Sequence, residues 1–310
     1  MSKPRKKPVL HDCDANSDDL ITSMVMRNAP NLELVASVIT NGLCYVADGY
    51  RAMRRLEHFT GCPEVEIGVC DQEMPNPFPP EWRSDSRRYN RLPCLARALG
   101  KVRRPRRATA VVERRLKSAT APITFVCTGP TTVLAAVLKR KPELAAKIRQ
   151  LVVMGGAVRV AGNVQAVHAG DGTAEWNVFC DPHSFKTVLA HDIPVRLIAL
   201  DVTNQLPIDR ALLDQLKAMA ATSRCAEVAA QMWELQAGRQ IYLWDPTTAL
   251  SLIRPDLFRF EYVGIDVVTE GRSAGRLVEL PPGQGRLVEL ATAVDKEQVL
   301  ACFLQLLGNR

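Results

Sequence analysis

Four aspartates stand within the eight-residue stretch 12–19, DCDANSDD, which follows an apolar run at the start of the chain. Carboxylates this close repel one another and raise one another's pKa unless a cation or a role in proton transfer compensates. Carboxylate oxygens bind hard cations such as calcium, and they also act as general bases. The alternative is a solvated acidic turn that caps the next helix, since aspartate favours N-cap positions. The stretch therefore predicts either a metal and acid–base site or a helix cap.

Further polar motifs follow along the chain. They are CTGPTT at 127–132, VVMGGAV at 152–158, GNV at 162–164, DGTAEWNVFCDP at 171–182 and IYLWDPTTAL at 241–250. Taken in this order with DCDANSDD, the series resembles the nucleoside hydrolases, which use water to cleave the N-glycosidic bond of ribonucleosides. The resemblance covers roughly residues 8–260. The tryptophan of EWN, NPFPPEWR at 76–83 and the tryptophan of LWDP look most like the purine-specific inosine-adenosine-guanosine hydrolases of trypanosomatids.

The resemblance implies a calcium site built entirely from oxygens. Its protein ligands would be the carboxylates of Asp14, Asp19 and Asp245 and the backbone carbonyl of Thr128. Such a set suits a hard cation with six to eight ligands, and the ion would neutralise the clustered charge. The ribose diol and one water would complete the coordination. Asp14 is also the expected general base, because a carboxylate within reach can take the proton of a water whose pKa the metal lowers.

Substrate contacts are expected from a second set of residues, again on the resemblance. The expected ribose contacts are Asp18 and Asn177 at the ring hydroxyls, Asn163 and Glu175 at the hydroxymethyl end, Met154 beneath the sugar and Asn41 beside them. Asn16 and Glu81 are candidates for contacts with the base, and Trp176 is a further substrate-binding candidate. The alternative for EWN is that its Glu and Asn only cap the helix that follows.

Two tryptophans separate the chain from relatives that prefer inosine and uridine. Those relatives carry a candidate proton donor, histidine, where this chain has Trp244, and purine-specific relatives enclose the base between tryptophans at the places of Trp82 and Trp244. Each desolvated aromatic face favours a cation such as a protonated purine by roughly 1–2 kcal/mol, so two faces raise the protonated fraction about 30- to 700-fold. Purine ribonucleosides are therefore the expected substrates. A broader enzyme that also accepts pyrimidine nucleosides is the alternative, and Asn41 matches the general family rather than the aspartate of the purine branch.

The elements that position these residues alternate along the chain. Strands are expected at 8–12, 32–40, 65–69, 123–128, 148–154 and 194–200, and helices at 47–59, 131–147 and 182–192. This alternation predicts a single α/β domain over 1–310 with an open, mostly parallel sheet flanked by helices, the Rossmann-like fold of nucleoside hydrolases. Ligands bind beyond the carboxyl ends of such strands. Asp14, Asn41, Thr128 and Met154 each stand at one of those ends, so they should converge.

Two segments depart from this pattern. Residues 71–120 are poor in strand pattern and rich in Pro and Arg, which predicts a long insertion and a lid over the site. The sequence GRLVEL occurs at 275–280 and again at 285–290, separated by PPGQ. Two such runs around a turn predict a β-hairpin.

Composition argues against several other functions. The net charge is +7, with much of the excess in KPRKK near the start and in residues 101–117, but aromatics are sparse there and no nucleic-acid partner is expected. No apolar run reaches the roughly 18 residues of a membrane span, so no membrane partner is expected. Nine scattered cysteines without a metal-binding spacing predict a reducing location and no zinc site, and the absence of a signal core predicts a cytoplasmic location.

Two further expectations concern single residues and assembly. His11 and His168 are candidate site histidines. The family resemblance favours a homo-oligomer, with a dimer first.

Two rival functions use some of the same residues. Haloacid-dehalogenase-like phosphatases also begin with a strand and DxD, but they need Thr or Val where this chain has Asn16, and they leave EWN and LWDP unexplained. A basic nucleic-acid-binding protein would account for the charge runs, and it predicts salt-sensitive RNA binding that survives loss of Asp14.

Overall fold

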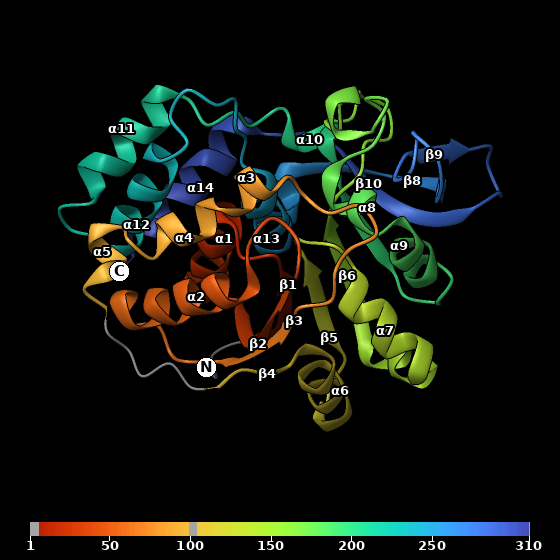
Figure 1. The fold of residues 1–310 in the computed structure, drawn as a ribbon, viewed down its shortest axis with the longest axis horizontal. Helices are drawn as coiled ribbons and strands as arrows, with labels where there is room; N and C mark the ends of the chain where they lie inside the picture. Colours follow the sequence, from red (N-terminus) through yellow and green to blue (C-terminus); the bar gives the residue numbers. More distant parts are fainter. Residues whose placement is uncertain (1–5, 99–103, 310) are drawn as a thin grey trace.

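The structure is a computed structural model that describes residues 6–98 and 104–309. Within these residues one sheet has the strand order β4-β3-β2-β1-β5-β6-β7-β10-β8-β9 (Figure 1). Its strands are β1 (Lys7–Cys13), β2 (Leu32–Thr40), β3 (Glu66–Cys70), β4 (Arg106–Arg107), β5 (Ile123–Cys127), β6 (Ile148–Met154), β7 (Val195–Ile198), β8 (Phe258–Val267), β9 (Leu277–Leu280) and β10 (Arg286–Val294). The pairs from β4 to β7, and β7 with β10, are parallel, whereas β8 is antiparallel to both β10 and β9. The expected single α/β domain with a mostly parallel sheet is confirmed.

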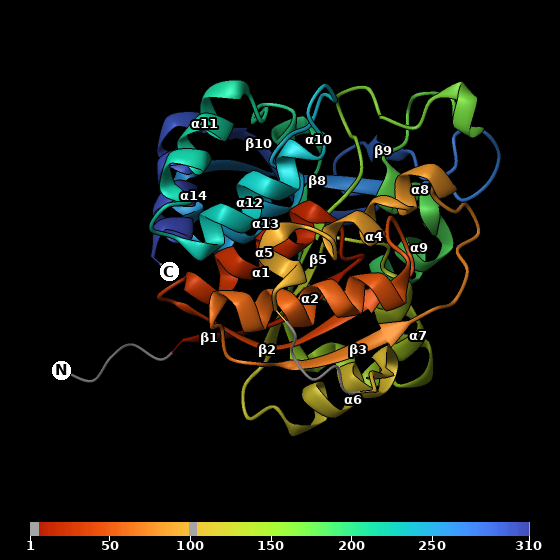
Figure 2. The same ribbon diagram turned by 60° about the vertical axis from the view of Figure 1, so that its left-hand side comes forward.

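Helices cover both faces of the sheet. They are α1 (Ser17–Asn28), α2 (Val46–Thr60), α3 (Pro80–Arg83), α4 (Asp85–Tyr89), α5 (Pro93–Ala96), α6 (Ala108–Ser118), α7 (Thr132–Arg140), α8 (Trp176–Cys180), α9 (Pro182–Leu189), α10 (Leu200–Thr203), α11 (Arg210–Met219), α12 (Arg224–Glu234), α13 (Trp244–Ile253) and α14 (Lys296–Gly308), with short 3₁₀ turns at Pro142–Lys147, Ala166–His168 and Pro255–Leu257. Figure 2 shows α2 and α6 on opposite sides of β2 and β3.

Alternating side chains of the inner strands build two separate cores. In β5, Val126 packs into the core shared with α1, α2 and α12–α14, whereas Phe125 and Cys127 pack into the core shared with α6, α7 and α9. This follows from the two-residue period of a strand, and it explains why the buried strands read as continuous apolar runs. Both cores hold the sheet rigid beneath the loops at its carboxyl edge.

The expected strands match β1, β2, β3, β5, β6 and β7 closely, and one expected helix is divided. The helix predicted at 131–147 ends at Arg140, and Pro142 opens a 3₁₀ turn. Lys141, the residue before the proline, leaves the helical region with φ −142° and ψ 70°. A proline disfavours helical geometry in the residue before it, which accounts for the break.

The prediction of a hairpin for the repeated GRLVEL is wrong. Both copies form strands, β9 and β10, but β8 lies between them and pairs with each. Gly264 of β8 is opposite Leu280 on one side and Leu287 on the other, so the chain steps across β8 between the two copies. A Cβ on Gly264 would lie 2.0 Å from the carbonyl oxygen of Gln284. Glycine at this point is what allows the connecting loop to cross.

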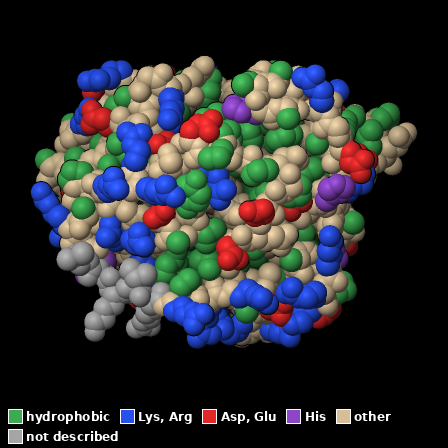
Figure 3. Space-filling view, in the orientation of Figure 1, with side chains coloured by type: hydrophobic (Ala, Val, Ile, Leu, Met, Phe, Trp, Pro, Cys, Tyr) green, Lys and Arg blue, Asp and Glu red, His purple; other side chains and the backbone are tan. Residues whose placement is uncertain are grey.

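The segment 71–120 contains two different parts. Residues 80–96 form the short helices α3, α4 and α5, whereas 106–118 form β4 and α6, whose apolar side chains join the sheet core. Figure 3 shows Lys and Arg side chains along the lower edge, where Figure 1 places α6. Residues 3–5 and 101–103 of the two basic runs lie outside the described residues. The movement of 71–120 as a lid, and the absence of a nucleic-acid partner, stay predictions.

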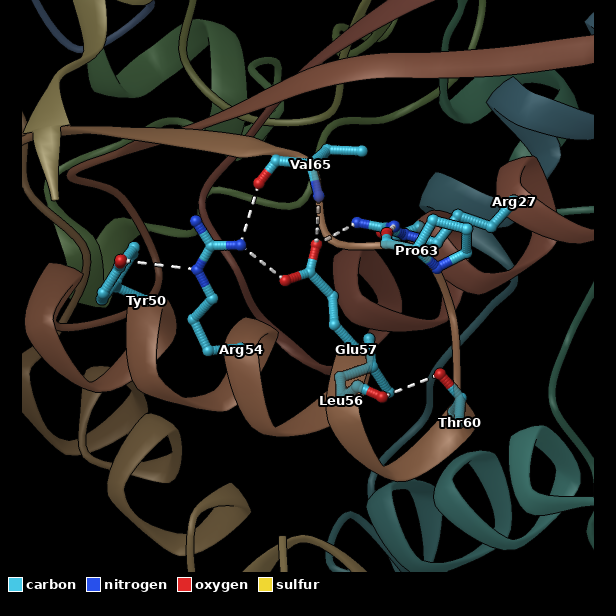
Figure 4. A network of polar contacts seen from close by, with 9 residues as sticks. Arg27, Tyr50, Arg54, Leu56, Glu57, Thr60, Pro63 and Val65 are labelled. Carbon is cyan, nitrogen blue, oxygen red and sulfur yellow. Dashed lines mark hydrogen bonds and ion pairs between the residues drawn. The ribbon is translucent and has the colours of Figure 1, made fainter. Parts of the chain in front are cut away.

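A buried ion pair network ties the layer of α1 and α2 together (Figure 4). The carboxylate of Glu57 accepts hydrogen bonds from Arg27 Nη2 at 2.6 Å, Arg54 Nη1 at 2.7 Å and the backbone N–H of Val65 at 3.2 Å. These groups come from α1, α2 and the loop before β3. The network therefore fixes α1, which carries two of the site aspartates, against α2. Among the described residues, no helix has the length and apolarity needed to cross a bilayer.

Candidate active site

A cavity of about 390 Å³ lies at the carboxyl ends of the central strands. Asp14 follows β1, Thr128 follows β5 and Met154 ends β6, and all three line the cavity. The other predicted site residues in its wall are Asn16, Asp18, Trp82, Asn163, Glu175, Trp176, Asn177, Trp244 and Asp245. The structure thus brings together residues from seven separate sequence motifs.

Three predicted site residues are not in the cavity wall. Asp19 is fully buried behind it, where its carboxylate oxygen lies within 4.8 Å of those of Asp18 and Asp245. Asn41 is turned toward Arg83 and the backbone carbonyls of Asp71 and Gln72, and the side chain of Glu81 is exposed. A contact between Asn41 or Glu81 and a substrate stays a prediction without support from their positions.

Asp19 is held by bonds that serve both the helix and the site. One of its oxygens accepts from the backbone N–H of Asn16 at 2.9 Å in a capping box at the start of α1, and the other accepts from the hydroxyl of Thr128 at 2.5 Å. His11 Nε2 lies 2.8 Å from the same hydroxyl, which has already donated its hydrogen to Asp19, so the ring donates. Helix capping and a metal-binding role are therefore compatible in this stretch.

Close backbone packing positions the carboxylate of Asp14. Its Oδ2 accepts from the backbone N–H of Leu43 at 2.7 Å, and a Cβ added to Gly42 would lie 2.4 Å from that oxygen. Ala15 turns the chain from β1 toward α1 with a φ of +58°, a left-handed conformation that costs a non-glycine residue about 1–2 kcal/mol. Ala15 therefore stands at a strained turn that the surrounding core maintains.

Burial raises the pKa of every carboxyl group in the cluster. The pKa of Asp18 rises to about 7 through burial and the nearby Asp14 carboxylate. Burial raises the pKa of Asp14 as well, and it raises those of Asp19 and Asp245 well above the ordinary range, with neighbouring aspartates adding to the effect. A buried group of like charges with this property is a place where a cation or a proton is strongly favoured.

The EWN motif supports the cavity wall through its backbone contacts. Glu175 caps α8: its two carboxylate oxygens accept from the backbone N–H groups of Asn177 at 2.9 Å and Gly156 at 2.8 Å. The side-chain amide of Asn177 donates to the carbonyls of Thr128 and Met154, each at 3.2 Å. The motif therefore both caps a helix and ties together the loops after β5 and β6.

The two tryptophans come from different apolar clusters on the cavity wall. Trp82 packs with Phe78 and Trp176, with its ring centroid 5.2 Å from that of Trp176, and His168 contacts it edge-on at 4.9 Å. Trp244 packs instead against the small cluster of Met154, Ala157 and Leu200. The separate clusters give the cavity two aromatic walls.

A sequence model of the inosine-uridine preferring nucleoside hydrolases matches residues 9–301. The chain belongs to the nucleoside hydrolase family. Its reaction is therefore hydrolysis of the N-glycosidic bond of a nucleoside, and the phosphatase alternative is excluded.

Related nucleoside hydrolases have mixed substrate names. The pyrimidine-specific ribonucleoside hydrolase RihA of Salmonella agona (strain SL483) is 27% identical over 291 residues, which span 86% of this chain and 85% of RihA. The crystal structure of the inosine-uridine preferring nucleoside hydrolase from Bacillus anthracis superposes with a TM-score of 0.90 at 30% identity, covering 97% of this chain and 99% of that one. A purine-preferring ribonucleoside hydrolase from Gardnerella vaginalis, at 22% identity and a TM-score of 0.80 over 97% of this chain and 98% of that one, shows the shared fold alone. These relatives do not separate a purine-specific branch from the others.

The donor set of this nucleoside hydrolase fits a hard divalent cation. Asp18, Asp19 and Asp245 bring carboxylate oxygens within 4.8 Å of one another, and Asp18 Oδ1 is buried with no hydrogen-bond partner among the described residues. A second group, His11, Cys13 and Asp19, is less suitable. His11 Nε2 is engaged by Thr128, and burial keeps the Cys13 thiol protonated by raising its pKa. The all-oxygen group is therefore the possible metal site. It contains two of the expected calcium ligands, Asp19 and Asp245, together with Asp18, which was expected at the ribose, and it does not include the expected ligand Asp14.

The metal-free enzyme is expected to lose stability as the pH rises from 6 to 8. In the folded state the pKa of Asp12 is raised by burial to about 8, and those of Asp18 and Glu175 to about 7. The folded state therefore holds more protons than the unfolded state in this range, and its stability falls with pH. The pKa of His11 is lowered to about 3 in the folded state, so this one residue makes the stability rise with pH. Its effect is confined to pH values below about 6.5, where the unfolded histidine is protonated.

Thermal unfolding in a chelator checks this prediction. The Tm should fall between pH 6 and pH 8 without metal, and added calcium should raise it more at pH 8, where more of the carboxyl groups are ionised and need a cation. A metal-free Tm that does not change with pH would show that these carboxyl groups are not held protonated by burial.

Seven residues of the cavity wall were not predicted from the sequence. They are Leu43, Phe78, Asp85, Gln236, Arg239, Gln240 and Ile241. Phe78 lies within NPFPPEWR and Ile241 within IYLWDPTTAL, and Asp85 and 236–240 are close to these two motifs in the chain, so membership of a motif or nearness to one was the available signal. Arg239 Nη1 pairs with Asp85 Oδ2 at 2.8 Å, which joins these two regions across the cavity.

Proposed function

We propose that this nucleoside hydrolase acts on purine ribonucleosides and releases the free base and ribose. The observation that carries the proposal is the pair of tryptophans, Trp82 and Trp244, which line the same cavity from separate apolar clusters. Two aromatic faces stabilise a planar base most strongly when the base carries a positive charge, as a protonated purine does.

The sugar half of the cavity supplies the groups for bond cleavage. Asp14, Asp19, Asp245 and the Thr128 carbonyl would hold calcium, which when bound supplies a Lewis acid that lowers the pKa of water. Asp14 acts as the general base and accepts the proton of the attacking water. Asp18, Asn177, Asn163 and Glu175 orient the ribose hydroxyls, and Met154 lies against the sugar. The clustered carboxylates stabilise an oxocarbenium-like transition state, as in other glycoside hydrolysis.

The departing base is activated without a histidine at position 244. Trp244 and Trp82 favour the protonated base by stacking, and solvent supplies the proton. The indole Nε1–H of Trp244 is buried without a hydrogen-bond partner among the described residues, so the contact that Trp244 offers the base is its aromatic face.

A pyrimidine or mixed preference is the second candidate. RihA, which is 27% identical to this chain, is named pyrimidine-specific. The base end of the cavity also contains polar groups, among them Gln236, Gln240 and the Arg239–Asp85 pair, that can bond to any base edge. The ratio of kcat/KM for inosine to that for uridine separates the two candidates. We expect inosine to be favoured by about 30-fold or more, the lower bound for two stacked faces.

Replacing Trp244 tests how the base leaves. Trp244→Ala is expected to lower the turnover number on inosine about 5- to 30-fold, because one aromatic face is lost from the protonated base. On p-nitrophenyl riboside, whose leaving group needs no proton, the loss should be smaller. Trp244→His is the matched variant, since it restores a proton donor and should recover part of the inosine activity. Equal losses on both substrates would mean that the tryptophan only holds the substrate in place.

A homodimer and a cytoplasmic location complete the proposal. Both rest on the family resemblance and on sequence composition. Light scattering of the purified enzyme measures the assembly, and cell fractionation measures the location.

A further inference from the structure

Two adjacent side chains of the four-residue helix α3 point in different directions. Trp82 lines the cavity, whereas Arg83 turns toward the loop 41–45 that joins β2 to α2. None of the four residues of α3 is buried, and a single helical turn has little stability of its own. The placement of Trp82 therefore depends on its ring contacts with Trp176 and His168 and on the contacts that its neighbours in α3 make.

Arg83 makes three contacts with the loop 41–45. Its Nη2 donates to the side-chain carbonyl of Asn41 and to the backbone carbonyl of Cys44, the latter at 3.3 Å. Its guanidinium also lies over the ring of Tyr45, 4.8 Å from the centroid. A planar guanidinium can meet all three partners at once, which a lysine ammonium cannot.

The same loop positions the catalytic carboxylate. The backbone N–H of Leu43 donates to Asp14 Oδ2 at 2.7 Å, and Gly42 packs directly against that oxygen. Asn41 is bound on both sides: its amide hydrogens go to the carbonyls of Asp71 and Gln72, at 3.3 and 3.0 Å, and its oxygen accepts from Arg83. Asn41 thus anchors Arg83 and is not part of the cavity wall.

From these contacts we infer that Arg83 is a positioning residue, which fixes Trp82 against the loop that holds Asp14. It links the aromatic wall for the base to the carboxylate that activates water, so that both are in place together. The inference rests on the proposed function for the role of Trp82 in binding the base. The anchoring itself is a property of the enzyme without substrate.

Arg87 provides a matched control on the next helix. Its guanidinium also lies over the Tyr45 ring, at 4.4 Å, but its side chain is 59% exposed and its ion pair with Asp48 is 3.6 Å long. Among the described residues, Arg87 has no hydrogen bond to the loop 41–45. The two arginines therefore share the aromatic contact and the charge, and they differ in the anchoring bonds.

Steady-state kinetics on inosine provide the first test. Arg83→Ala should lower kcat/KM about 10-fold or more, because bonds from a charged donor are lost, and Arg87→Ala should change it less than about 3-fold. Arg83→Lys keeps the charge without the forked geometry and should stay impaired. In a Trp82→Ala background, adding Arg83→Ala should lower kcat/KM by a further factor of less than about 2, because Arg83 acts through Trp82. Independent, multiplicative losses would overturn the inference.

Hydrogen exchange of the substrate-free enzyme provides a test that does not need activity. Arg83→Ala should raise amide exchange in residues 80–90 and in 41–45, whereas Arg87→Ala should leave both segments as in the wild type. Unchanged exchange in Arg83→Ala would overturn the anchoring role. If the alanine variant does not fold, Arg83→Lys takes its place in the same comparison. A wild type that releases no base from any nucleoside would refute the proposed function, and the exchange result would still decide whether Arg83 anchors α3.

Discussion

Asp14→Asn is expected to lower the turnover number by about 10²- to 10⁴-fold, the contribution of a positioned general base. The asparagine side chain has nearly the same shape, and its carbonyl oxygen can still accept the 2.7 Å bond from the N–H of Leu43. It cannot accept a proton from water. The variant should therefore fold normally and retain part of its metal affinity while losing the chemical step.

Three measurements make the Asp14 result decisive. At saturating calcium, the metal content and Tm of Asp14→Asn should stay close to those of the wild type, so that the loss is assigned to catalysis. Asp19→Ala, which removes a carboxylate from the possible metal site, should instead lose both bound calcium and activity. Asp85→Asn alters another cavity-lining carboxylate, which is paired with Arg239. It should lower the turnover number by less than about 10-fold. An Asp14→Asn enzyme with bound calcium and a turnover number within tenfold of wild type would exclude Asp14 as the base.

Glu57→Ala is expected to destabilise the protein by about 3–5 kcal/mol, because it leaves two buried guanidinium groups without their carboxylate. The side chains of Arg27, Arg54 and Glu57 are 4%, 12% and 0% exposed. The arginines keep only bonds to neutral groups, such as the carbonyl of Val65 at 2.8 Å for Arg54. Glu57→Gln retains an acceptor but loses the charge, so it should fall between alanine and the wild type.

A surface ion pair provides the control for Glu57. Arg210 and Asp214 on α11 are 76% and 53% exposed, with Arg210 Nε 3.0 Å from Asp214 Oδ1. Such a pair contributes little in water, so Asp214→Ala should change the free energy of unfolding by about 0.5 kcal/mol or less. Urea unfolding of the three variants measures the difference. If Glu57→Ala and Asp214→Ala cost the same, the buried network does not hold α1 against α2.

The sequence alone was sufficient for the parallel strands β1, β2, β3, β5, β6 and β7 and for the family. Apolar runs in β1, β2, β5 and β6 are buried on both faces, so their hydrophobicity is continuous and easy to recognise. Strand ends carry the site residues in this class of fold, so the positions of Asp14, Thr128 and Met154 follow from strand boundaries. The motifs that carry the family resemblance are local, and a local pattern is what a sequence displays directly.

Only the tertiary structure decided which side chains face the cavity and which hold it in shape. Asn41 stands at a strand end like Asp14, yet Arg83 and two backbone carbonyls turn it away, because a side chain's direction depends on partners far along the chain. The repeat GRLVEL indicated two strands but not that β8 separates them, since pairing depends on which edges are free in space. Gln236, Arg239 and Gln240 belong to no motif, and packing alone brings them to the cavity. Local composition determines where strands and helices form, and long-range packing determines what each polar side chain can reach.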